Sequence, residues 1–126
     1  MRNLMLAGLG AGFIANGLMM LFASQAWYDL VPGVSDTGPM NFHFVRDIGC
    51  AYLTSGISLL WLLRDGAVWP AAFAAGIFLA LHALLHVWDT LAGRVTLPHL
   101  ASDAVLVMLP AVIVLWLAWP RRLILE

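Results

Sequence analysis

The chain has 126 residues, of which 63% are hydrophobic and 10% are charged, and its formal net charge is −1 at pH 7. Soluble domains carry about 25% charged residues, so this composition, with a mean hydropathy of +0.92, excludes an ordinary soluble domain and predicts an integral membrane protein. The chain also has no basic patch, which excludes a nucleic-acid partner.

Four apolar stretches are long enough to cross a hydrocarbon core about 30 Å thick, which takes roughly 20 helical residues. They cover residues 4–26, 43–63, 70–88 and 100–119. The sequence therefore predicts an all-α protein: a single transmembrane domain over residues 1–126, built as a four-helix bundle in the lipid bilayer.

The first stretch, residues 4–26, follows Arg2 and also resembles a signal peptide. Its apolar run is longer than the usual signal-peptide core, so we expect a membrane-spanning helix. Gly8 and Gly12 are four residues apart, a spacing that lets membrane helices approach closely, and they predict its packing face. Residues 27–42 follow as a loop rich in Pro, Gly and Asp.

Arginine sets the predicted orientation, because the chain has no lysine. With four spans the arginines divide into two sets: Arg2, Arg64, Arg121 and Arg122 on one side, and Arg46 and Arg94 on the other. The positive-inside rule then places both termini in the cytoplasm. Most carboxylates lie at the opposite, outer end: Asp29, Asp36, Asp47, Asp89 and Asp103.

Three of the predicted helices carry polar residues at spacings that place them on one helical face. These stripes are His43, Asp47 and Cys50 in the second helix, His82, His86 and Asp89 in the third, and His99 and Asp103 in the fourth. At 1.5 Å per residue, all three stripes fall within about 10 Å of the same outer end. We expect them to converge there.

Neutral imidazoles and carboxylates that converge in a dry site are the usual ligands of transition metals. A bound cation also offsets the cost of burying the aspartates. The sequence therefore predicts one or two metal ions held by these candidates: His82, His86, Asp89, His43, Asp47, His99 and Asp103. Either two ions bind, or some of the seven residues orient the ligands. We expect copper ahead of zinc or iron, because it ranks highest in the divalent affinity order and the outer compartment exposes it.

Some of these residues also have an interpretation without a metal. Asp47 and Asp103 lie in first helical turns, where a carboxylate interacts favourably with the helix dipole. His43 and His99 lie at span ends and could be interfacial residues. For these four residues the sequence leaves both interpretations open.

Arg46 could pair with a neighbouring aspartate, and Cys50 could be a small packed side chain. His82 and His86 differ because they lie inside a span, where an imidazole without a metal needs its own hydrogen-bond partner. Together with Asp89 they carry the metal prediction.

The stretch "RDIGCAYLTSGISLL" resembles the second-helix pattern of the DoxX-like superfamily of small four-helix bacterial membrane proteins, with Arg46, Gly49 and Gly56 in the matching places. The resemblance covers little more than one helix. It implies a four-helix bundle in a bacterial inner membrane, associated in some members with redox or quinone chemistry, and it includes none of the histidines. The alternative function is therefore an accessory subunit or homo-oligomer whose polar stripe binds a partner, a lipid headgroup or a quinone.

Overall fold

The computed structural model describes residues 1–120, and every regular element in this range is helical, which confirms the all-α prediction. The elements are α1 (Arg2–Phe22), α2 (Ser24–Leu30), a 3₁₀ turn (Val34–Thr37), α3 (Phe42–Arg64), a second 3₁₀ turn (Gly66–Val68), α4 (Trp69–Leu91), α5 (Leu97–Asp103), the π-helical turn η3 (Ala104–Met108) and α6 (Leu109–Ala118). The terminal residues used in the topology prediction, Arg121 and Arg122, lie outside the described residues.

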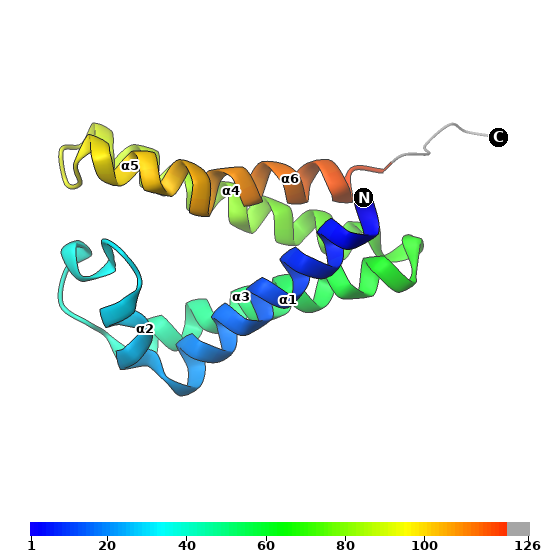
Figure 1. Cartoon of the computed structure of the whole chain (residues 1–126), viewed down its shortest axis with the longest axis horizontal. Helices are drawn as coiled ribbons and strands as arrows, with labels where there is room; N and C mark the ends of the chain where they lie inside the picture. The colour runs from blue at the N-terminus through cyan, green and yellow to red at the C-terminus, as the bar shows by residue number, and fades with distance from the viewer. Residues whose placement is uncertain (121–126) are drawn as a thin grey trace.

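The elements form four long helical segments, because α5, η3 and α6 follow one another without a break. These helices are arranged as two pairs, α1 with α3 and α4 with α6 (Figure 1). The pairs lie close together at the end that carries the N-terminus, and they separate toward the end that carries α2 and α5 (Figure 1).

Within the described residues, three helical segments are long and apolar enough to cross a membrane: Arg2–Phe22, Gly66–Leu91 and Leu97–Ala118. This finding fits a membrane protein. The predicted second span corresponds to α3, which is 23 residues long but less apolar than the others. Arg46, Asp47 and several hydroxyl side chains lower its apolarity.

Three predicted helices have different bounds in the structure, and the third of the four extends to Leu91 instead of residue 88. The first ends at Phe22 instead of residue 26, because the chain turns at Ala23 and then forms the separate helix α2. The buried hydroxyl of Ser24 stabilises this turn by donating to the carbonyl of Met20. The last helix begins earlier than predicted, at Leu97, and widens into η3 just before Pro110, which has no N–H for the ordinary α-helical bond.

Glycines allow α1 and α3 to pack with their backbones in contact. A Cβ atom added to Gly56 would lie 2.6 Å from the carbonyl oxygen of Gly10, and one added to Gly17 would lie 2.7 Å from that of Gly49. Each helix thus presents two glycines seven residues apart, a spacing of two turns that keeps them on one face. Small residues at an interface are the usual basis of helix packing in membranes.

The predicted packing face of Gly8 and Gly12 is wrong. Both glycines are exposed, and a Cβ atom added to either one would meet nothing within 4 Å. The first helix contains several glycines, and the spacing within one helix cannot show which of them a partner helix contacts. The positions of Gly49 and Gly56 in α3 decide which glycines of α1 make the contact.

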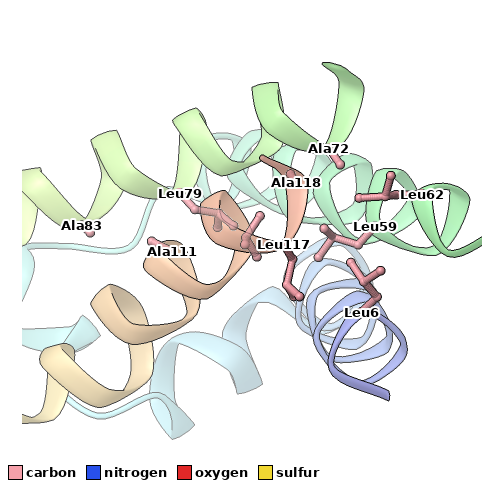
Figure 2. Packing of buried hydrophobic residues seen from close by; sticks show 10 residues of the cluster. Leu6, Leu59, Leu62, Ala72, Leu79, Ala83, Ala111, Leu117 and Ala118 are labelled. Carbon is pink, nitrogen blue, oxygen red and sulfur yellow. The ribbon is translucent and has the colours of Figure 1, made fainter. Parts of the chain in front are cut away.

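The hydrophobic core lies where the two pairs meet. Figure 2 shows Leu6 of α1, Leu59 of α3, Leu79 of α4 and Leu117 of α6 side by side. The guanidinium of Arg2 also donates to the carbonyl of Leu117, at 3.3 Å, and so joins the start of α1 to the end of α6. We call this the packed end of the molecule. The opposite end, which carries α5 and residues 31–41, is called the polar end.

Candidate metal centre

The polar residues of α4 and α5 meet at the polar end around one buried carboxylate. Asp103, at the end of α5, is only 6% exposed. Its Oδ2 lies 2.7 Å from Nδ1 of His86 on α4 and 3.4 Å from Nε2 of His99 on α5. Two imidazoles from neighbouring helices are therefore directed at a single carboxylate oxygen.

These three residues could hold a metal ion. His86, His99 and Asp103 each offer one ligand atom, and all three atoms lie within 4.8 Å of one another. Ligand atoms around one tetrahedral zinc ion are about 3.4 Å apart. Around an ion of this size, Nδ1 of His86 and Oδ2 of Asp103 would have to move apart from 2.7 Å. The widest pair of ligand atoms, which lies within 4.8 Å, would have to close by up to about 1.4 Å.

His82 lies directly behind His86, one helical turn closer to the packed end. The two Nε2 atoms are 3.3 Å apart, so the rings hydrogen-bond to one another. The imidazole of His82 stacks on Phe78 and lies in a T-shaped contact with Tyr52, with ring centroids 6.2 and 6.0 Å apart. His82 is thereby fixed in place and contacts the other imidazole, while Asp103 is contacted by His86 and His99.

The local sequence explains why α4 and α5 present these residues to each other. His82 and His86 are four residues apart, as are His99 and Asp103, so each pair lies on one helical face. The chain reverses between the helices at Gly93, whose φ of +71° is the left-handed conformation that glycine adopts without strain.

A salt bridge closes this reversal. Nη1 of Arg94 lies 2.8 Å from Oδ1 of Asp89, and the Arg94 amide donates to the Asp89 carbonyl at 2.9 Å. Asp89, a predicted ligand, thus has a cationic partner of its own. Its role as a metal ligand stays a prediction.

The structure does not bring the α3 stripe to this cluster. His43 and Asp47 pair with each other at 3.3 Å on the outer surface of α3, with side chains 89% and 60% exposed. Cys50, on the same stripe, is also exposed. Arg46 lies over the ring of Phe42 instead of pairing with an aspartate. A ligand role for these residues stays a prediction without support from their positions.

The glycine contact with α1 explains this orientation. At 100° per residue, the face of Gly49 and Gly56 is roughly 140° around α3 from the stripe of His43 and Asp47. Packing the glycines against α1 therefore turns the stripe away from the centre of the molecule. The spacing of the stripe alone could not predict which way it would point.

The sequence reasoning missed Gly33 as a site residue. Val31 to Val34 form a turn in which the Val34 amide donates to the Val31 carbonyl at 3.3 Å. Gly33 has a φ of +80°, and a Cβ atom added to it would lie 1.6 Å from Cε1 of His99. The loop thus packs directly on the imidazole of His99. The Pro-Gly pair at 32–33 predicts the turn, but nothing in the sequence predicts its partner.

A cavity of about 450 Å³ lies beside the cluster, within the 300–1,000 Å³ range typical of small-molecule sites. Its lining comes from several elements of the polar end: most of residues 27–41 and parts of α1, α3, α4, α5 and η3. His82, His86, His99 and Asp103 all belong to this lining. The candidate metal ligands therefore face a mainly apolar chamber.

Together these observations define the class: a helical protein with three helices that could span a membrane and a His/Asp cluster that could hold a metal ion. No protein-family model, curated protein or solved structure matches the chain. Its function must therefore be inferred from this site.

Proposed function

We propose that the chain is a membrane metalloprotein that binds a transition-metal ion through His86, His99 and Asp103. The observation that carries this proposal is the direction of two imidazoles at one buried carboxylate oxygen. A carboxylate oxygen can accept two hydrogen bonds, so the feature that favours a shared cation is the gathering of three ligand atoms within 4.8 Å of one another. Two neutral imidazoles and one carboxylate are a common ligand set for such ions.

The hydrogen bond between His82 and His86 supplies the orienting partner that metal-bound histidines usually have. Without an ion, Nδ1–H of His86 donates to Asp103, and its Nε2 accepts from Nε2–H of His82. With an ion on Nδ1, the proton of His86 resides on Nε2 and is donated to Nε2 of His82. Both imidazoles change tautomer and stay neutral, so His82 can support either state.

Nitrogen and oxygen donors suit copper, zinc and iron, and copper stands first in the divalent affinity order. We expect one ion at the His86, His99 and Asp103 site. Purified protein is expected to carry about one copper, zinc or iron ion per chain, or to take up one with micromolar affinity or better. Elemental analysis and isothermal titration test this. Protein that neither carries nor takes up any of these metals contradicts the proposal.

The membrane arrangement is part of the proposal: a four-helix bundle in a bacterial inner membrane, with both termini in the cytoplasm. The described arginines divide as predicted, with Arg2 and Arg64 at the packed end and Arg46 and Arg94 at the polar end, but two at each end set no orientation. The predicted orientation therefore depends on Arg121 and Arg122, which follow the last span in the sequence. The resemblance to DoxX-like proteins agrees with this location and stays a prediction.

Cysteine labelling tests this orientation. In a Cys50→Ala background, a membrane-impermeant maleimide is expected to label Ser35→Cys in intact cells, because this exposed residue lies at the polar end. Gly66→Cys, exposed near the packed end, is expected to react only after permeabilisation. The reverse pattern would invert the topology.

A second candidate function rests on the polar surface of α3. His43 and Asp47 are well exposed on a helix that the proposal places in the membrane. Exposed ionisable groups are costly in lipid, so a second copy of the chain or another membrane protein could cover this surface. An accessory subunit of a membrane complex is the function to adopt if the protein binds no metal.

A further inference from the structure

The cavity beside the cluster is lined by apolar side chains from separate elements. Val34 and Met40 come from the loop, Ile48 from α3, Leu85 from α4 and Val107 from η3. Trp27 and Tyr28 of α2 add aromatic surface. Such walls favour an apolar molecule, since a charged or strongly polar one would lose its hydration without new partners.

Hydrogen bonds hold the loop that forms one side of this cavity. The indole of Trp27 donates to Asn16 at 2.9 Å, and the phenol of Tyr28 donates to the carbonyl of Gly38. The loop in turn packs on His99 through Gly33. The apolar walls and the polar cluster therefore line the same cavity.

A metal ion held by the three candidate ligands would keep a coordination position free for a further ligand. Three protein ligands fill three positions of a four-coordinate ion, and the fourth is where catalytic metal sites bind water or substrate. His86, His99 and Asp103 all line the cavity, so an ion held by them would lie at its wall, within reach of a molecule in this space.

We propose that the cavity binds a small, mainly apolar molecule that carries one oxygen or nitrogen donor, and that this donor occupies the open position on the metal. The inference rests on the proposed metal site and adds the class of its ligand. The volume fits a molecule the size of one or two aromatic rings with short substituents. An acyl chain of a lipid could occupy the same cavity, but it has no oxygen or nitrogen donor to coordinate the ion.

Cobalt-loaded protein tests this proposal, because the visible spectrum of Co²⁺ reports its coordination. The two probes are imidazole and 4-phenylimidazole, which share the nitrogen donor and differ by an apolar ring. The cobalt titration comes first and tests the metal site by itself. We expect 4-phenylimidazole to change the cobalt spectrum with a Kd at least about tenfold lower than imidazole, as expected for burying an aromatic ring.

Variants that fill the cavity show whether this advantage arises there. Ile48→Trp, on the α3 wall, is expected to retain cobalt and to lose most of the tenfold difference. Val34→Trp fills the cavity from the loop and provides a second variant in case the first does not fold. Ile57→Trp is the matched control, because Ile57 lies on the same helix, is 51% exposed and is absent from the cavity lining.

Each outcome bears on one proposal. A tenfold difference that survives in Ile57→Trp and disappears in the folded cavity variants supports the inference. Equal affinity for the two probes, an unchanged cobalt spectrum, or a difference that persists in both cavity variants overturns it, while bound cobalt leaves the metal site standing. Wild-type protein that takes up no cobalt, copper, zinc or iron removes the proposed function itself.

Discussion

Replacing His86 by alanine is expected to raise the Kd for the metal more than about 100-fold, because changes to residues that only orient ligands cost 10- to 100-fold. His86 lies at the centre of the cluster, with one ring nitrogen 2.7 Å from Asp103 and the other 3.3 Å from His82. Its loss removes a proposed ligand and leaves the carboxylate without its closest partner. Isothermal titration and metal content after dialysis measure the effect.

His43→Ala is the matched control for this variant. Like His86, His43 pairs with an aspartate. Its partner is Asp47, four residues along the same helix and 3.3 Å away, and this pair is exposed on the surface of α3. Its metal affinity is expected to match the wild type. His82→Ala should fall between the two, with a 10- to 100-fold loss, because this imidazole contacts only another imidazole of the cluster.

A double variant gives the decisive result for this site. His86→Ala combined with His99→Ala leaves Asp103 as the one remaining member of the proposed ligand set, and it is expected to bind no metal. Size-exclusion profiles and helical circular dichroism must first show that the variant is folded. Full metal content in a folded double variant would rule out the site and leave the cluster as hydrogen bonding between α4 and α5.

Substituting Gly56 by alanine is expected to lower the free energy of unfolding by about 1–3 kcal/mol, the usual cost of overpacking a tight contact. The added methyl group would lie 2.6 Å from the carbonyl oxygen of Gly10, so α1 and α3 must move apart. Alanine has the higher intrinsic helix propensity, by about 1 kcal/mol. The destabilisation is therefore opposed to the intrinsic trend. Thermal unfolding in detergent measures it.

Gly12→Ala separates the contact from the propensity. Gly12 lies within α1 and has open space where the methyl group would go. We expect this variant to be as stable as the wild type or more stable, by up to about 1 kcal/mol. If both alanine variants shift stability in the same direction and by the same amount, the glycine contact between α1 and α3 has no energetic role.

The segment that resembles DoxX-like proteins has a clear structural role. Gly49 and Gly56, two of the three matching residues, are the α3 glycines that contact α1. In this chain these two glycines serve helix packing, and the family resemblance itself stays a prediction. It says nothing about the histidine cluster, which lies on α4 and α5.

The sequence predicted the clustering of residues within each helix but only part of the site. The pairs His82 with His86 and His99 with Asp103 follow from helical spacing, and a short hairpin between α4 and α5 is enough to bring them together. The α3 stripe has the same spacing, yet it points outward because of a glycine contact on the other side of the helix. Spacing fixes a residue's face, and the neighbouring helices decide what that face meets.

The sequence by itself determined the helical class, the apolar segments and the four-residue spacing of the polar groups, because composition and helical periodicity are local properties. Only the tertiary structure decided that His86, His99 and Asp103 share one point, that Gly33 covers His99 and that a cavity lies beside them. These features depend on how helix pairs pack and diverge. The packing is set by backbone contacts between residues far apart in the chain, such as Gly10 with Gly56, which no pattern within a single helix encodes.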